Sequence, residues 1–172
     1  MTQTKNSETD KANKRIRLRL FVAGLVATAL PGCSVFRSKP TPPYVYYDGS
    51  RGSQVLKTAM SQYGVDYDYG SANPGDGFDC SGLIWWAYRQ HGITVPRRTV
   101  EQRRAGWAAS RKNIRQGDIV VFRIGRNQLH TGLVVDKNRF LHAPSSGGYI
   151  RIDNFNDAYW KNRIVGFRRI VS

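Results

Sequence analysis

The spacing of apolar residues changes once along the chain, near residue 107, and this change sets the fold class. Before it, residues 54–63 and 83–91 have helical spacing, and Gly92 is placed to end the second helix. Residues 99–107 predict a further, exposed helix. After it come short β-type runs between Gly, Asn and Pro signals, at 118–123, 131–136, 139–143, 149–152 and 165–171. Helices followed by a meander of strands predict an α+β domain, with an antiparallel sheet packed on the helices.

The first 32 residues predict a secretory signal peptide rather than part of this fold. Five cations crowd residues 11–19, and an apolar run follows from Leu20 to Leu30. That run is shorter than the roughly 20 apolar residues that a membrane span needs. A buried core helix is the alternative, but the adjacent cations argue against it. A basic flank, a short apolar stretch and small residues before a cysteine are typical of an export signal.

The end of this segment, Leu30-Pro31-Gly32-Cys33, resembles the bacterial lipobox, in which the cysteine is lipidated and becomes the mature N-terminus. More than one acyl chain gives stable membrane anchoring. The resemblance implies a lipid anchor on Cys33. Ser34 stands where an Asp would retain the protein in the inner membrane, which implies an outer-membrane lipoprotein facing the periplasm.

Three segments are therefore expected: a signal peptide over 1–32, a lipidated tether over 33–50 and one catalytic domain over 51–172. The tether contains Pro40, Pro42 and Pro43, which favour an extended chain. Its aromatic end, residues 44–47, is expected to dock on the domain. Residues 64–78 are expected to form a loop rich in Gly, Asp and Tyr.

The formal net charge is +15, and about +11 of it lies beyond Cys33. A basic surface suits an anionic polymer or a membrane. Nucleic acid is not expected as a partner of an exported protein, and basic residues that serve only solubility are the alternative.

Cys80 is one of only two cysteines and has the features of a nucleophile. If Cys33 is acylated, Cys80 has no disulfide partner, and a lone thiol in an oxidising compartment is a liability unless it is used. Asp79 can cap the apolar helix, which places Cys80 in its first turn. Unpaired N–H groups and the helix dipole there favour a thiolate and could hold an oxyanion.

A thiolate hydrolase also needs a base and a group that orients it, and three histidines are available. His91 lies roughly 16 Å along the helix from Cys80, at 1.5 Å per residue, and is a poor candidate. His130 and His142 flank two predicted strands, so pairing of these strands as a hairpin would bring them together. Two buried structural histidines are the alternative.

The chain resembles the NlpC-type cell-wall cysteine peptidases, papain-like enzymes with a Cys-His-His triad. Seven segments carry the resemblance in order: Tyr67-Asp68-Tyr69-Gly70, Asp79-Cys80-Ser81-Gly82, Pro96-Arg97-Arg98-Thr99 with Gln102, the strand 116–122, His130-Thr131-Gly132, Leu141-His142-Ala143-Pro144, and the ending at Tyr159-Trp160 and 166–169.

The resemblance implies Cys80 as nucleophile, His130 as general base and His142 as the orienter of His130. It implies that Tyr67, with Tyr69 as the alternative, places its hydroxyl near the nucleophile. Substrate and oxyanion contacts are expected also from Ser81 and Arg97, the latter through a substrate carboxylate. No cofactor is expected. Zinc ligation by the two histidines and the cysteine competes with this reading, but no CxxC or HExxH spacing supports it.

The expected activity is a peptidoglycan endopeptidase that cuts an amide of the peptide stem or cross-link through a thioester. The bond is either D-glutamate–diamino acid or D-alanine–diamino acid. A papain-like hydrolase or acyltransferase on another amide or lipid, and a non-catalytic wall-binding lipoprotein, are the alternatives. The oligomeric state stays open.

Overall fold

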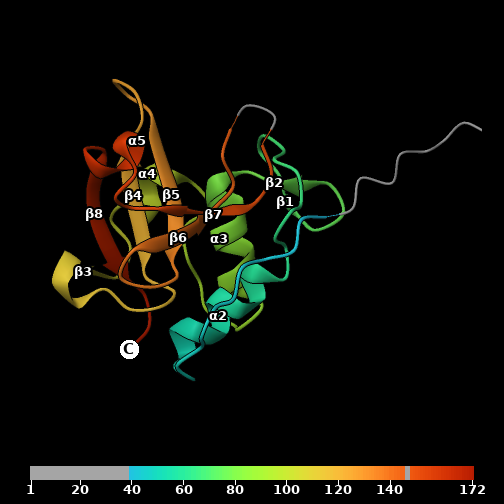
Figure 1. The fold of residues 1–172 in the computed structure, drawn as a ribbon, viewed down its shortest axis with the longest axis horizontal. Coiled ribbons are helices and arrows are strands. Elements are labelled where there is room, and N and C mark those ends of the chain that lie inside the picture. The colour runs from blue at the N-terminus through green and yellow to red at the C-terminus, as the bar shows by residue number, and fades with distance from the viewer. Residues whose placement is uncertain (1–38, 146–147) are drawn as a thin grey trace, which may run out of the picture. The chain divides into compact units, whose positions relative to one another are not determined.

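The computed structural model describes residues 39–145 and 148–172, so the predicted signal peptide over 1–32 and the predicted lipid site at Cys33 lie outside the described part. Its helices are α2 Arg51–Met60, α3 Cys80–Arg89, α4 Thr99–Gln102 and α5 Ala158–Lys161, with a 3-10 turn, η1, at Arg111–Asn113. Its strands are β1 Ala72–Asn73, β2 Gly77–Phe78, β3 Trp107–Ala109, β4 Ile119–Arg123, β5 Leu129–Val134, β6 Arg139–His142, β7 Arg151–Asn154 and β8 Ile164–Arg169 (Figure 1).

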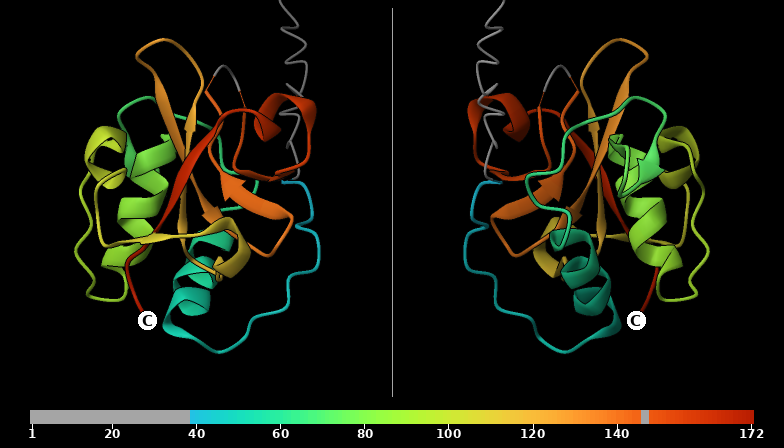
Figure 2. Two further views of the ribbon diagram at one scale, coloured as in Figure 1. Left: turned by 90° about the vertical axis from the view of Figure 1, so that its left-hand side faces the viewer. Right: turned by 90° about the vertical axis from the view of Figure 1, so that its right-hand side faces the viewer.

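Six strands form one antiparallel sheet in the order β3-β8-β4-β5-β6-β7, and β1 pairs with β2 as a separate hairpin. Helices α2 and α3 pack side by side and form one hydrophobic cluster with the sheet (Figures 1 and 2). The arrangement confirms the α+β class. No helix in the described residues is long and apolar enough to cross a membrane.

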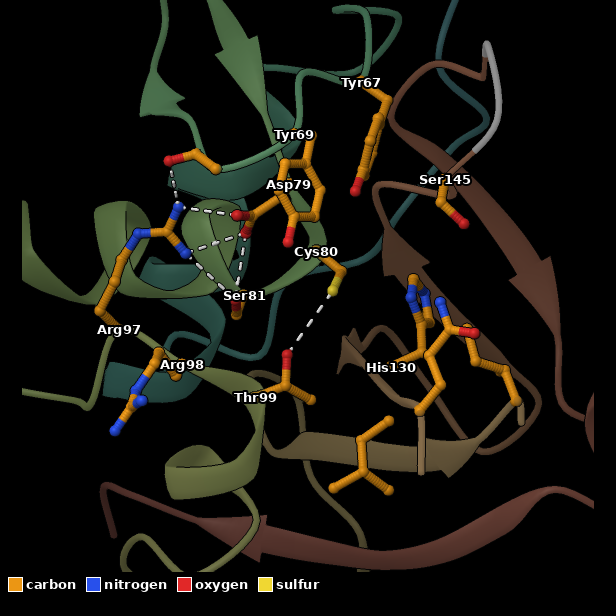
Figure 3. Close-up of a pocket in the computed structure, with 14 residues that line it drawn as sticks. Tyr67, Tyr69, Asp79, Cys80, Ser81, Arg97, Arg98, Thr99, His130 and Ser145 are labelled. Atoms are coloured by element: carbon orange, nitrogen blue, oxygen red, sulfur yellow. Dashed lines mark hydrogen bonds and ion pairs between the residues drawn. The ribbon is translucent and has the colours of Figure 1, made fainter. Parts of the chain in front are cut away.

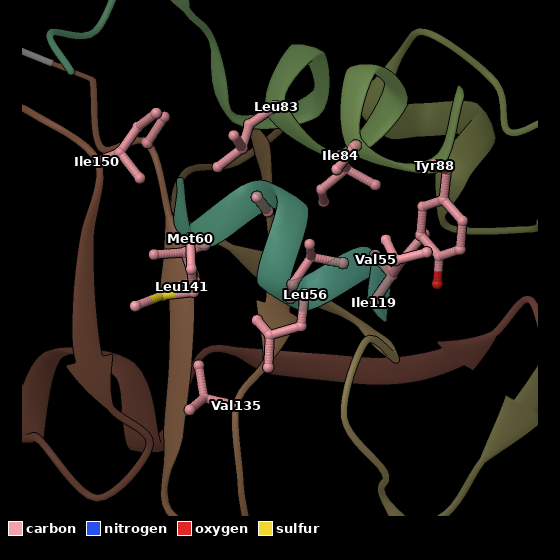
Figure 4. Close-up of a cluster of buried hydrophobic side chains, with 14 of the residues drawn as sticks. Val55, Leu56, Met60, Leu83, Ile84, Tyr88, Ile119, Val135, Leu141 and Ile150 are labelled. Carbon is pink, nitrogen blue, oxygen red and sulfur yellow. The ribbon is translucent and has the colours of Figure 1, made fainter. Parts of the chain in front are cut away.

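Helices α2 and α3 each begin at a side-chain cap and bury one apolar face. The Ser50 hydroxyl accepts a hydrogen bond from the Ser53 N–H at 3.1 Å, which starts α2 three residues before the predicted 54–63. Asp79 caps α3, as the sequence predicts. The buried faces point toward each other and toward the sheet (Figure 4) and include Val55, Leu56, Ala59, Leu83, Ile84 and Ala87.

Strand β4 is buried on both sides, because the sheet is covered on both faces. Ile119 and Val121 join the cluster that contains the helices, while Val120 and Phe122 join a second cluster with Trp160. Alternate residues of a strand point to opposite faces. Fully burying such side chains contributes about 1.5–3 kcal/mol each, so this strand fixes the middle of the sheet.

The expected exposed helix over 99–107 is wrong. Only α4 is helical, and its last residue, Gln102, is fully buried. The chain turns at Gly106, which has a φ of 54°, and enters β3, which pairs with β8. The Arg168 guanidinium donates to the carbonyl oxygens of Ala105 and Gly106 at 2.6 and 2.7 Å, so tertiary contacts take the groups that a longer helix would use.

The remaining predictions differ from the structure in detail. Strands β4, β5, β6 and β8 begin and end within two residues of the predicted runs. Strand β7 begins at Arg151 rather than at Tyr149, which makes only an isolated bridge with Asp66. The hairpin β1–β2 and the four-residue α5 are too short to carry a hydrophobic period, and the sequence did not indicate them.

The aromatic end of the expected tether contacts the domain through Val45 and Tyr47. Val45 is buried in the helix-side cluster, whereas Tyr44 and Tyr46 are exposed. The Gln116 amide donates to the Tyr46 carbonyl and accepts from the Asp48 N–H. The chain is thus held at the surface before α2 begins.

A glycine contact joins α2 to the turn before β4 and can be tested by substitution. A Cβ on Gly52 would lie 2.2 Å from the Gln116 carbonyl oxygen, a backbone atom that cannot move aside alone. Gly52→Ala is expected to lower the free energy of unfolding by about 1–3 kcal/mol, measured by thermal or urea unfolding. Gly166→Ala, where a Cβ meets open space, is the control and should change it by less than about 0.5 kcal/mol. Equal effects of the two would contradict this packing.

Candidate active site

A cavity of about 480 Å³ opens between the start of α3, the loop before it, α4 and β5 (Figure 3). Cys80 and His130 line it from opposite sides. Segments distant in sequence therefore converge on it. Four further lining residues are site residues predicted from the sequence: Tyr67, Tyr69, Ser81 and Arg97. The remaining lining residues are Gly70, Asp79, Arg98, Thr99, Ile124, Gln128, Leu129 and Ser145.

Cys80 is the first residue of α3, at the positive end of the helix. The Asp79 carboxylate accepts a hydrogen bond from the Gly82 N–H at 2.6 Å. First-turn N–H groups lack partners within a helix, so those of Cys80 and Ser81, two residues that line the cavity, are not used within α3. The helix start can thus receive a developing oxyanion. The Thr99 hydroxyl lies 3.8 Å from the Cys80 sulfur and limits the directions in which the sulfur can turn.

Arg97 lines the cavity, but its guanidinium is engaged by the protein. It binds both oxygens of Asp79, at 2.9 and 2.8 Å, and donates also to the carbonyls of Gly70 and Ser71. The Ser81 hydroxyl joins the same cluster, donating to Asp79 at 3.0 Å. A substrate carboxylate would have to displace these acceptors. In the structure Arg97 holds the loop before Cys80 against α3, and its contact with a substrate carboxylate stays a prediction.

His130 and His142 lie together because β5 and β6 pair as the expected hairpin. Leu133 opposes Leu141 in the register, which places the two histidines diagonally on one face. His130 Nε2 lies 2.8 Å from His142 Nδ1, and both side chains are buried. Because Nε2 of His130 contacts His142, Nδ1 is the ring nitrogen of His130 that is left for another partner. His91 instead contacts the Thr58 hydroxyl at 2.8 Å, on the helical side of the domain.

Asp153 continues this line of side chains on β7. Its carboxylate accepts from His142 Nε2 at 3.0 Å and from the Trp160 indole N–H at 3.0 Å. The Trp160 ring also stacks on His130, with centroids 5.5 Å apart. Asp153 is not among the site residues predicted from the sequence. The sequence feature that could have indicated it is an acidic residue two positions after Arg151. Arg151 is the register partner of His142 in the sheet.

Burial controls the charge of this group. It lowers the pKa of His130 to about 3 and lowers that of His142 as well. Burial alone would raise the pKa of Asp153, but hydrogen bonds from His142 and Arg151 hold it well below its usual range. Both imidazoles are therefore neutral at neutral pH, beside an ionised carboxylate.

The two tyrosines differ in position. Tyr67 is partly buried, and its hydroxyl points toward the Cys80 side of the cavity (Figure 3). Burial, followed by the nearby Cys80, raises its pKa, so it remains a neutral hydrogen-bond donor. Tyr69 is 87% exposed at the rim. These facts favour Tyr67 over Tyr69 as the tyrosine beside the nucleophile.

Gln102 joins the two halves of the cavity. Its side-chain NH₂ donates to the carbonyls of Ser81 and Pro96, at 3.0 and 2.9 Å, and its oxygen accepts from the Thr131 hydroxyl at 3.2 Å. It therefore ties the first turn of α3, which carries Cys80, to β5, which carries His130. Sequence reasoning treated this residue as part of an exposed helix and missed the contact.

A second cavity of about 490 Å³ lies on the other side of His130. It shares Ile124, His130 and Ser145 with the first, so the depression continues past the histidine. Its other lining residues are Pro144, Arg151, Asp153, Asp157, Tyr159 and Trp160.

Zinc ligation by Cys80, His130 and His142 was the competing interpretation of these residues. Over residues 39–145 and 148–172 no three His, Cys, Asp or Glu side chains gather as metal ligands. The two histidines use facing nitrogens on each other rather than on a common point.

Residues 64–169 match the NlpC/P60 family. The chain belongs to the NlpC/P60 family. It is 40% identical over 127 residues to the murein DD-endopeptidase MepS/murein LD-carboxypeptidase of Escherichia coli K12, covering 71% of this chain and 66% of that protein. It is 37% identical to the bifunctional muramidase/DL-endopeptidase CwlT of Bacillus subtilis, covering 67% of this chain and 36% of that protein.

Solved structures of the NlpC/P60 family share the fold. A lipoprotein-like family member from Staphylococcus aureus has a TM-score of 0.65 at 29% identity, covering 77% of this chain and 45% of that one. The peptidoglycan hydrolase RipB of Mycobacterium tuberculosis has a TM-score of 0.59 at 28% identity, covering 70% and 65%. The chain thus spans less than two thirds of the length of these relatives.

The buried neutral histidines predict a stability that falls in mild acid. In the unfolded chain a histidine titrates near 6.5, and in the fold the pKa of His130 is about 3, so between these values only the unfolded state binds the proton. The free energy of unfolding should fall below pH 6.5 by up to about 1.4 kcal/mol per pH unit for each histidine. Urea unfolding from pH 7.5 to 4.5 measures this.

Two variants make that measurement specific. His142→Gln removes one of the two buried groups and should roughly halve the slope. His91→Gln, outside the pair, is the control and should keep it. A wild-type stability that is flat from pH 6.5 to 4.5 would contradict neutral burial of the pair.

Proposed function

We propose that this protein is a cysteine peptidase that hydrolyses an amide bond in the peptide part of peptidoglycan. The observation that carries the proposal is the single line of side chains in which Cys80, at a helix start, faces His130, which is bonded to His142. A nucleophile, a base and an orienter of the base are the parts that nucleophilic amide hydrolysis requires. The relatives named as murein endopeptidases support the substrate class.

In this mechanism Cys80 gives its proton to His130 Nδ1 and attacks the amide carbonyl carbon. The first-turn N–H groups of α3 receive the oxyanion, helped by the neutral hydroxyl of Tyr67. The proton on His130 then passes to the leaving nitrogen, and the thioester on Cys80 remains. Water, deprotonated by His130, hydrolyses the thioester and regenerates the thiol.

We assign the orientation of the bound peptide from the two cavities. His130 must reach both the sulfur and the leaving nitrogen, and it borders both cavities. The acyl part of the peptide is therefore assigned to the cavity at Cys80, and the amine product to the cavity at Arg151 and Asp157. The bond is D-alanine–diamino acid or D-glutamate–diamino acid, since relatives named for DD- and for DL-cleavage both match this chain.

The location proposed is the cell envelope, on the outer membrane facing the periplasm. This part of the proposal rests on the sequence of residues 1–50, with a signal peptide over 1–32, a lipid on Cys33 and a tether that ends where the catalytic domain begins. The net charge of about +11 beyond Cys33 suits an anionic wall polymer at that place.

Incubation of the full chain with defined muropeptides, followed by mass spectrometry, tests the activity. Wild-type protein is expected to release fragments whose masses identify the bond, and Cys80→Ala is expected to reduce the rate by at least about 10³-fold because no thioester can form. Unfolding curves of both proteins control for folding. Equal fragment release by the two, or none by either, would refute the proposal.

Fractionation of cells that express the full chain tests the anchor. Cys33→Ala is expected to move the protein from the membrane fraction to the soluble fraction, because the acyl chains supply the attachment. Cleavage of muropeptides should stay within about twofold of wild type. A Cys33→Ala protein that remains with the membrane would contradict lipid anchoring at this residue.

A further inference from the structure

The Asp153 carboxylate is the acceptor in all of its hydrogen bonds, and one of the donors is His142, a member of the histidine pair. Oδ2 receives His142 Nε2 and Trp160 Nε1, each at 3.0 Å, and Oδ1 receives Arg151 Nε at 2.8 Å. The side chain is only 14% exposed. Its donors come from β6, β7 and α5, so the carboxylate is fixed from three elements.

This contact determines where the proton of His142 sits. An ionised carboxylate can only accept, so Nε2 of His142 must carry the hydrogen. The neutral ring then presents a lone pair at Nδ1. That lone pair lies 2.8 Å from His130 Nε2, which must therefore be the donor. The remaining nitrogen of His130, Nδ1, is left without a proton, and His130 lines the same cavity as Cys80.

The histidine pair alone does not choose this direction. Two neutral imidazoles can share one hydrogen either way, and the reversed pair would place a proton on His130 Nδ1. In that form His130 could not take the proton of Cys80. The Trp160 indole cannot accept a hydrogen bond, so it cannot replace the carboxylate in setting the direction.

We propose that Asp153 is a positioning residue that sets the tautomers of His142 and, through it, of His130, so that Nδ1 of His130 is free to take the Cys80 proton. The proton transfer from Cys80 to His130 rests on the proposed function, whereas the assignment of the tautomers does not. The S–H bond of Cys80 breaks and an N–H bond forms at His130. Asp153 keeps its charge throughout and stabilises the cation two side chains away.

The charges around the pair are consistent with this role. Asp153 is the acidic group that favours a protonated histidine pair, and Arg151, which is 37% exposed, opposes it. The phenols of Tyr63 and Tyr149 also lie near Asp153 and Arg151, and the raised pKa of Tyr63, due mainly to burial, keeps it neutral. Removal of the Asp153 charge should therefore make the imidazolium harder to form.

The tautomers can be read directly in the absence of substrate. The full chain carrying Cys33→Ser, with ¹⁵N-labelled histidine, gives ring-nitrogen chemical shifts that distinguish a protonated nitrogen from a bare one. His130 and His142 are both expected to carry the hydrogen on Nε2. In Asp153→Asn this pattern should be lost, because the side-chain amide offers a donor as well as an acceptor. A hydrogen on Nδ1 of His142 in the parent, or unchanged tautomers in Asp153→Asn, would overturn the proposal.

The reactivity of Cys80 gives a second readout that needs no peptidoglycan. In the same Cys33→Ser chain, alkylation of the single thiol by iodoacetamide is measured against pH. Asp153→Asn should slow alkylation at pH 7 by roughly 10-fold or more and move its rise to higher pH. With muropeptides kcat should fall roughly 10- to 100-fold and KM should change less than about threefold.

Asp136→Asn is the matched control. Asp136 also pairs with an arginine close in sequence, Arg139, at 2.7 Å, but it lines neither cavity. The Asp136→Asn substitution removes the same charge as Asp153→Asn and should leave the histidine tautomers, the alkylation rate of Cys80 and kcat unchanged. An Asp153→Asn protein that matches Asp136→Asn in all three would refute the positioning role. If no muropeptide is cut by the parent, the proposed function fails while the tautomers and the alkylation profile still decide the role of Asp153.

Discussion

The carboxylate of Asp79 is the contact on which the geometry of the cleft depends. It caps the helix that begins at Cys80 and binds both nitrogens of the Arg97 fork. Through Arg97 it also holds the carbonyls of Gly70 and Ser71, in the loop that follows Tyr67. One acidic side chain thus starts the helix and keeps the loop in place. Bidentate pairs of this kind fix orientation as well as distance.

The opposite wall of the cleft depends on the sheet. Strands β5 and β6 are buried on both faces, and their register fixes His130 and His142 as diagonal neighbours. Gln102 then ties β5 to the start of α3, so the two walls cannot separate freely. Catalysis that relies on positioning requires supports of this kind around the reacting groups.

Burial of the histidine pair lowers the stability of the fold in acid and also keeps water away from the pair. Neutral imidazoles in an apolar setting lower stability in acid, because the unfolded chain binds protons that the folded protein does not. The same setting shields the pair from water, while the Asp153 carboxylate gives direction to its hydrogen bonds. The ionised Asp153 beside His142 compensates part of the cost of charging the pair when a proton arrives.

Much of this protein was determined by local sequence. The helix start at Asp79-Cys80, the hairpin that joins His130 to His142 and the α+β order of elements follow from caps, alternation and turn residues, which act over a few positions. Only the tertiary structure decided what depends on distant partners. Residues 103–107, predicted as helix, form a turn and a strand in the structure, because the Arg168 guanidinium donates hydrogen bonds to the carbonyl oxygens of Ala105 and Gly106. It bound Arg97 to Asp79 and brought Asp153 to His142, since a side chain's partner across a sheet is fixed by register and not by sequence neighbours.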